Sequence, residues 1–133
     1  LQDRKRRDAT RIWFRPGAPW GLDPKTGDFN LWQGWALAPD PRGSWKRLLS
    51  HVHEVIADGD ETVARYVLDW MAYGIQQPAT LPETAIVLIG GEGTGKGMLL
   101  NSLGKLYGRH FMHLVQKSQL VGNFNDHHKD KLL

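Results

Sequence analysis

Residues 90–97 read Gly-Gly-Glu-Gly-Thr-Gly-Lys-Gly, and they follow the apolar run Ala-Ile-Val-Leu-Ile at residues 85–89. An apolar strand that runs through a glycine-rich loop into a helix is typical of chains that cradle a polyphosphate. In such a loop the backbone N–H groups converge on the β-phosphate, and a lysine reaches the outer phosphates. The sequence therefore predicts a nucleotide-binding loop of the P-loop type.

The loop departs from the P-loop template at one position. Gly90, Gly95 and Lys96 fit, but Gly97 stands where the template has the serine or threonine whose hydroxyl binds magnesium. Magnesium would then be held by phosphates, by water and by a carboxylate elsewhere. The alternative is an ordinary strand–turn–helix whose glycines serve only left-handed backbone geometry. That alternative explains the glycines but not the lysine at the mouth of the loop.

The expected ligands are ATP and Mg²⁺. Lys96 is the predicted catalytic residue, because its ammonium group would neutralise charge on the β- and γ-phosphates during hydrolysis. No residue is assigned as a ligand to the metal. The predicted nucleotide-binding residues are Gly91, Glu92, Gly93, Thr94, Gly95, Lys96, Gly97 and Met98. Most of these would act through backbone N–H groups, and the Glu92 side chain is expected to face solvent.

The composition is that of an ordinary globular chain. Of its 133 residues 41% are hydrophobic and 23% charged, and the absence of cysteine excludes disulfides and thiolate zinc sites. No apolar stretch is long enough for a membrane span, and no signal-peptide pattern opens the chain. These features predict a cytoplasmic protein that makes no contact with a membrane.

Basic residues concentrate at the N-terminus. The net charge is +3, and the first 15 residues include the run Arg4-Lys5-Arg6-Arg7 together with Arg11 and Arg15. One interpretation is an arm that touches nucleic-acid phosphate. The other, which the composition favours, is a solvated linker or an exposed edge.

Three segments are expected along the chain. Residues 1–43 form the basic segment and a small β-rich appendage, with residues 29–37 as the best strand and a turn at residues 40–43. Its tryptophans are either a base-stacking platform or, as we favour, the core of the appendage. The four are Trp13, Trp20, Trp32 and Trp35.

Residues 44–80 are expected to form a pair of helices. Ser44 would cap a helix over residues 45–57, and Asp60 would cap a second that runs to about Ile75. The second helix would bury a stripe that includes Val63, Ala64, Val67, Leu68 and Met71. His51 and His53 are two residues apart on the first helix, so they make a poor metal pair and are expected at its surface or rim.

Residues 81–133 are expected to form the first part of a P-loop NTPase core. A helix after the loop would end at Gly108 in a left-handed cap, and residues 110–115 would form the next strand. The strand–helix–strand order implies a right-handed parallel crossover. The fold class is therefore α/β: a β-loop-α-β unit with a partial parallel sheet, preceded by the helical pair and the tryptophan-rich β segment.

Four stretches, in order, resemble the helicase domain of phage and plasmid primase-helicases, a branch related to superfamily 3 DNA helicases. They are Phe-Asn-Leu-Trp-Gln-Gly-Trp at 29–35, Tyr-Val-Leu-Asp-Trp-Met-Ala at 66–72 with Gln-Pro at 77–78, the loop at 90–97, and Leu-Val-Gly-Asn-Phe-Asn at 120–125. The loop alone indicates only a P-loop protein, whereas the order and wording of all four indicate the family.

This resemblance implies an ATP-driven motor that assembles as a homo-oligomeric ring and moves along single-stranded DNA during replication. It also implies that a primase or polymerase module can precede the region, and that a Walker B acidic pair would follow Leu133. The chain then corresponds to the nucleotide-gripping part of a longer protein, and by itself it is expected to hydrolyse ATP negligibly.

Two other functions stay open at this point. A nucleotide kinase also uses a glycine-rich loop with Gly-Lys-Gly, although such loops usually continue with a hydroxyl residue where this chain has Met98. A non-hydrolysing nucleotide- or DNA-binding module would use the loop only to hold an anion. Its main contact surface would be the N-terminal basic run and the tryptophans.

Overall fold

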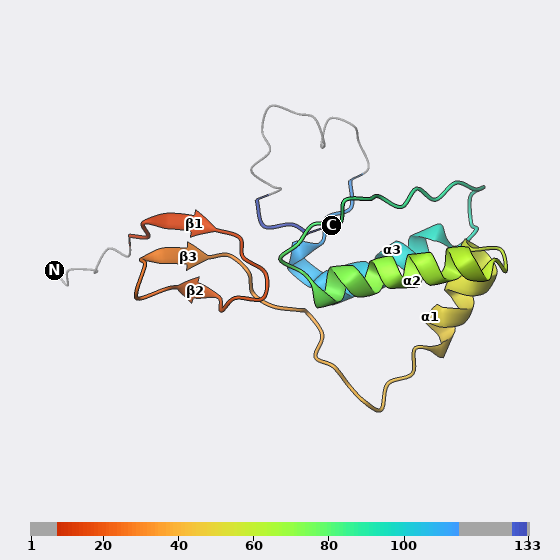
Figure 1. The fold of residues 1–133 in the computed structure, drawn as a ribbon, viewed down its shortest axis with the longest axis horizontal. Coiled ribbons are helices and arrows are strands. Elements are labelled where there is room, and N and C mark those ends of the chain that lie inside the picture. Colours follow the sequence, from red (N-terminus) through yellow and green to blue (C-terminus); the bar gives the residue numbers. More distant parts are fainter. Residues whose placement is uncertain (1–7, 115–128, 133) are drawn as a thin grey trace. The chain divides into compact units, whose positions relative to one another are not determined.

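The computed structural model of the protein describes residues 8–114 and 129–132. The chain divides into two compact units, one formed by residues 1–34 and 114–131 and the other by residues 35–113 and 132–133. Figure 1 shows a small sheet in the first unit and the helices in the second. Each unit is described by itself below, from its described residues.

The first unit is built on a three-stranded sheet with the order β1-β3-β2. The strand β1 (Arg11–Trp13) runs parallel to β3 (Asp28–Asn30), and β2 (Gly21–Leu22) runs antiparallel to β3. A tight turn joins β2 to β3, where the Gly27 N–H donates to the carbonyl of Asp23 at 2.8 Å. Gly27 has a φ of +73°, a left-handed conformation that glycine adopts without steric cost.

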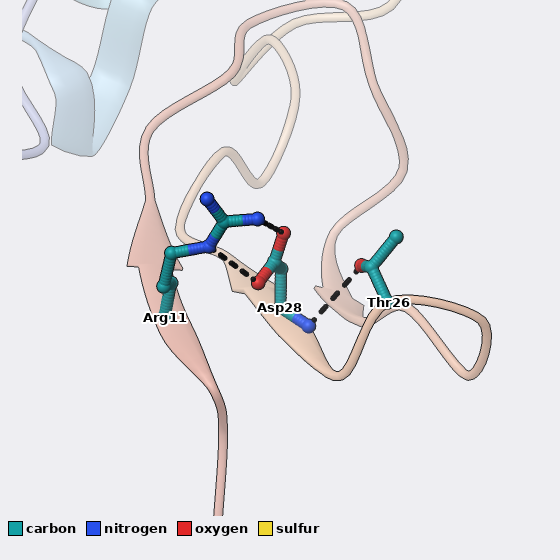
Figure 2. Close-up of polar contacts among 3 residues, drawn as sticks. All are labelled: Arg11, Thr26 and Asp28. Carbon is teal, nitrogen blue, oxygen red and sulfur yellow. Dashed lines mark hydrogen bonds and ion pairs between the residues drawn. The ribbon is translucent and has the colours of Figure 1, made fainter.

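Two buried polar side chains of β3, those of Asp28 and Asn30, hold the first unit together through hydrogen bonds. Figure 2 shows Arg11 donating twice to the Asp28 carboxylate, with Nε–Oδ1 and Nη2–Oδ2 distances of 3.1 and 3.2 Å. The Asp28 N–H donates to the Thr26 hydroxyl at 3.3 Å. The Asn30 amide group donates to the carbonyls of Arg15 and Pro19, both at 3.0 Å. These contacts satisfy polar groups that would otherwise be costly to bury.

Aromatic side chains supply the apolar part of the first unit. Trp32 is 5% exposed and meets the edge of Phe14 at a ring separation of 6.0 Å, and Trp20 meets Phe29 at 5.9 Å. The predicted strand over residues 29–37 is too long, because β3 ends at Asn30. Beyond it the Asn30 side chain accepts the Trp32 N–H at 3.2 Å, a local turn that replaces pairing with a neighbouring strand.

The second unit begins with the predicted helix at residues 45–57, which is helical but changes type within its length. The α-helix α1 (Lys46–Ser50) continues into η1 (His51–Ile56), a π-helix. The helix begins one residue later than predicted, with Trp45 in the N-cap position, but the Ser44 hydroxyl still accepts the N–H of Lys46 at 3.5 Å. The fully buried Val52 fixes η1 in the core of the unit.

The helix α2 (Glu61–Gln76) confirms the predicted cap. The Asp60 carboxylate accepts the N–H groups of Thr62 and Val63 at 2.8 and 3.0 Å, which satisfies two donors that have no partner within the helix. Ala64, Val67 and Met71 are buried, as predicted. Val63 is 44% exposed, so its place in the buried stripe was wrong.

The helix α3 (Lys96–Tyr107) packs with α2 and η1 around one core. Its buried residues are Leu99, Leu103 and Tyr107, while Met98 and Leu100 are 50% and 39% exposed. The helix ends at Gly108 as predicted, with a φ of +56°. Its ψ of −122° lies outside the left-handed helical region that the sequence suggested. A short 3₁₀ helix, η2 (Gly108–His110), follows directly.

The two strands predicted around α3 join no sheet in the part of the chain that the structure describes. Residues 85–89 alternate, however: Ile86 and Leu88 pack against the core, whereas Val87 and Ile89 are 76% and 94% exposed. This period of two is that of a strand, but a strand is completed only by hydrogen bonds to a neighbour. His110 belongs to η2, so the second segment cannot begin as a strand there. The complete β-loop-α-β unit stays a prediction.

Candidate functional site

The glycine-rich loop at residues 90–97 lines an open cavity of about 1120 Å³. All eight predicted nucleotide-binding residues contribute to its wall, so the structure brings the predicted set together. The exposed face of α3 continues the wall with Asn101, Ser102 and Lys105, and Phe111 closes one side. The Glu92 side chain is at an exposed position of the loop, as expected from the sequence.

The backbone of the loop turns at two glycines. Gly93 and Gly95 have φ values of +74° and +85°, which an L-residue with a side chain adopts only at a steric cost. Gly95 is also the N-cap of α3, so the chain turns directly into the first helical residue, Lys96. The N–H groups in the first turn of a helix lack partners four residues back, and they carry the positive end of the helix dipole. Of the predicted phosphate-binding amides, the Met98 N–H already donates to the carbonyl of Gly95 at 3.0 Å. The loop therefore places an anion-binding helix end at the cavity wall.

Lys96 folds back over the loop. Its ammonium group donates to the carbonyls of Gly90 and Gly91 at 2.8 and 2.6 Å and to the Thr94 hydroxyl at 2.8 Å. The Thr94 hydroxyl donates in turn to the carbonyl of Gly91 at 3.0 Å. The positive charge is thus held across the mouth of the loop, and the flexible four-carbon stem allows it to exchange these carbonyls for phosphate oxygens.

Gly97 lies in open space. A Cβ atom built there meets nothing within 4 Å, so the missing hydroxyl of the P-loop template is not explained by lack of room. Within the described ranges, no group of three or more histidine, aspartate or glutamate side chains could hold a metal ion. The amides and the lysine of the loop are groups that suit a polyphosphate.

Sequence reasoning missed one residue that contacts the loop, His51. It was expected at the surface or rim of its helix, but its Nε2 atom lies 3.0 Å from the carbonyl oxygen of Gly95. A Cβ atom at Gly95 would stand 2.6 Å from His51 Cε1 and 3.3 Å from Val55 Cγ1, so η1 packs directly on the turn of the loop. No sequence signal points to this contact, because 44 residues separate the two partners.

The predicted tryptophan set is divided between the two units. Trp32 and Trp20 belong to the first unit, whereas Trp35 packs on Tyr107 in the second, at a ring separation of 5.0 Å. Two guanidinium groups lie over the Trp13 ring, with Arg15 Cζ 3.9 Å and Arg11 Cζ 4.6 Å from its centroid. These distances are in the range of cation–π contacts, and they occupy the ring that a base would need for stacking.

The Arg11–Asp28 pair adds a charge effect to this region. The hydrogen bonds and the positive charge of Arg11 hold the pKa of Asp28 below its usual range, against an opposing effect of burial.

The run Arg4-Lys5-Arg6-Arg7 and the family-like stretch at residues 120–125 lie outside the described residues.

Comparison of the chain with family models, with curated proteins and with solved structures finds no match. Among the described residues, no helix has both the length and the apolar character needed to cross a membrane.

Proposed function

We propose that this chain binds ATP through the loop at residues 90–97 and forms the nucleotide-gripping part of a replicative DNA helicase or primase-helicase motor. The observation that carries the proposal is the position of Lys96, whose ammonium group lies over a glycine turn and beside the N-terminus of α3. Amide groups, a helix dipole and a mobile cation at one cavity wall are the parts that polyphosphate recognition requires.

In this proposal the loop amides hold the β-phosphate, and Lys96 moves from the Gly90 and Gly91 carbonyls to the β- and γ-phosphates. Its positive charge then stabilises the charge that develops during hydrolysis. Mg²⁺ bound with the nucleotide would add further neutralising charge, and because Gly97 offers no hydroxyl it would be held by phosphate oxygens, by water and by a carboxylate outside the loop. The wider assignment is a cytoplasmic, ring-forming motor on single-stranded DNA, with an upstream primase or polymerase module. It rests on the order of the four family-like stretches.

Calorimetric titration with ATP and Mg²⁺ tests the binding step. We expect heat of binding that ADP and pyrophosphate compete away, and its loss in Lys96→Ala. Lys46→Ala is the matched control, since it removes the same charge from an exposed position at the start of α1. A folded chain that binds no nucleoside triphosphate, or a Lys96→Ala variant that binds like wild type, would overturn the assignment.

Phosphate release by the longer parent protein that the resemblance implies, measured with and without single-stranded DNA, separates the motor from its enzymatic alternative. A motor shows turnover that DNA stimulates and that Lys96→Ala abolishes. Phosphoryl transfer to a nucleotide acceptor, with no effect of DNA, would identify a nucleotide kinase instead.

A non-hydrolysing DNA-binding module is a second candidate, and the Arg11–Trp13–Arg15 stack of the first unit favours it. Arg15 is held on the Trp13 face and pairs with no carboxylate among the described residues, which suits contact with a phosphate. Arg15→Gln should then lower DNA affinity and reduce its salt dependence, whereas Arg65→Gln, an 81% exposed arginine of α2, should change neither. If Arg15→Gln binds DNA with the same affinity as Arg65→Gln and wild type, the Arg11–Trp13–Arg15 stack makes no contact with DNA.

A further inference from the structure

His51 links the π-helix η1 to the phosphate loop through a single backbone oxygen. Its Nε2 atom lies 3.0 Å from the carbonyl oxygen of Gly95, which is the residue immediately before Lys96. The same oxygen accepts the N–H of Met98 at 3.0 Å. Gly95 O is thus fixed from two sides, by the helix that follows it and by a side chain from 44 residues earlier.

The peptide plane between Gly95 and Lys96 carries this constraint into the binding site. In a planar trans peptide the C=O and the next N–H point in opposite directions. Holding the carbonyl of Gly95 toward His51 therefore directs the N–H of Lys96 away from η1. A hydrogen bond accepted at the carbonyl also polarises the peptide and strengthens its N–H as a donor.

The surroundings of His51 keep the ring in this position. Its neighbour Val52 is fully buried and anchors η1, while Val55 touches the same glycine turn from the next part of the helix. Only hydrogen fits at the Gly95 α-carbon on this side, since a Cβ would stand 2.6 Å from the ring. His51 is therefore seated against the loop by packing as well as by its hydrogen bond.

We propose that His51 is a positioning residue of the phosphate-binding loop, which sets the direction of the Lys96 N–H and thereby the affinity for a nucleoside triphosphate. The proposal rests on the proposed function and extends it to a side chain of the preceding helical pair. His51 acts through the Gly95 peptide and makes no contact with the nucleotide in this role.

Three substitutions separate positioning from general packing. His51→Gln keeps an N–H donor at the distance of Nε2, His51→Asn places its donor too close to the backbone to reach Gly95, and His51→Leu removes the donor. His53→Leu is the matched control, because it removes a 41% exposed histidine from the same helix that faces Glu61 instead of the loop. Titration calorimetry with ATP and Mg²⁺ gives the affinities, and urea unfolding without nucleotide gives the stabilities.

We expect about tenfold weaker ATP binding in His51→Asn and His51→Leu, as for the loss of one hydrogen bond that orients a ligand donor. His51→Gln should stay within about twofold of wild type and His53→Leu should be unchanged. His51→Gln and His51→Asn should unfold at similar urea concentrations, so that the difference in affinity cannot come from stability. This pair keeps the test decisive if His51→Leu fails to fold.

Two outcomes overturn the inference in distinguishable ways. If wild type binds ATP and His51→Asn binds it equally well, His51 has no positioning role and the proposed function stands. If folded wild type binds no ATP, the proposed function fails and the inference falls with it.

Discussion

Substituting Gly95 by alanine should be far more costly than the same change at Gly93. Both glycines have positive φ values, +85° and +74°, so both substitutions incur the steric cost of a left-handed residue, about 1–2 kcal/mol. They differ in their surroundings, because a Cβ at Gly93 meets nothing within 4 Å. At Gly95 the Cβ would stand 2.6 Å from His51 Cε1.

The extra loss of stability at Gly95 comes from the displacement of the His51 ring by the new Cβ atom. Moving the ring away breaks its 3.0 Å contact with the Gly95 carbonyl, which costs about 1 kcal/mol. Forcing the side chain and Val55 out of their packing adds about 1 kcal/mol more. Gly95→Ala should therefore lower the free energy of unfolding by about 3–4 kcal/mol, about 2 kcal/mol more than Gly93→Ala.

Urea unfolding of six proteins measures this difference: the two glycine variants and their parent, in the wild-type background and again in a His51→Ala background. Removing the ring should bring the cost of Gly95→Ala close to that of Gly93→Ala, because only the φ contribution and the 3.3 Å approach to Val55 Cγ1 are left. Equal costs in the wild-type background would refute the proposed packing of η1 on the loop. A difference that persists without the ring would assign the strain to some other neighbour.

Three further outcomes are expected. Gly97→Ser should strengthen the magnesium dependence of ATP binding relative to Gly97→Ala, because both side chains fit in open space but only serine offers an oxygen. Calorimetry at varied Mg²⁺ would contradict this if both variants showed the same magnesium dependence. The pKa of Asp28 is lower in the folded protein than in the unfolded chain, where it is about 3.9, so the ionised carboxylate stabilises the fold above that pH. This stability is lost as the pH falls through the folded pKa. Urea unfolding should therefore show a loss of stability in acid that Arg11→Ala removes. Leu103→Ala, at a 4% exposed core position, should cost about 2–5 kcal/mol in the same assay, and a loss under about 1 kcal/mol would place it outside the core.

Local signals in the sequence were sufficient for the helices. Asp60 followed by an apolar stripe predicted α2, because an N-cap acts on N–H groups two and three residues away. Gly108 predicted the end of α3 for a similarly local reason. The change from α1 to a π-helix at His51 was not predictable, since an apolar period of about one helical turn does not distinguish the two hydrogen-bond patterns.

Strands and long-range contacts were harder, since they depend on partners elsewhere. The apolar run at residues 85–89 shows the alternation of a strand without belonging to a sheet in the described residues, and β3 stops at Asn30 where a longer strand was expected. For the site, the glycine pattern predicted which residues gather at the cavity. It gave no indication of His51, whose role depends on how two helices pack.

The π-helix makes the spacing of this region sensitive to chain length. Its hydrogen bonds span five residues, as in the bond from the Ala57 N–H to the Val52 carbonyl at 2.9 Å. Deleting the exposed Glu54 would let the turn relax to α geometry, in which each hydrogen bond spans one residue fewer, so the residues on either side would keep nearly the same orientation. Inserting a residue that stays in the helix would instead rotate the residues after it by about 100° relative to those before it. Val52 could then keep its core position only if Val55 left the glycine turn, so an insertion here should disable the loop, and a deletion should not, while every loop residue stays intact.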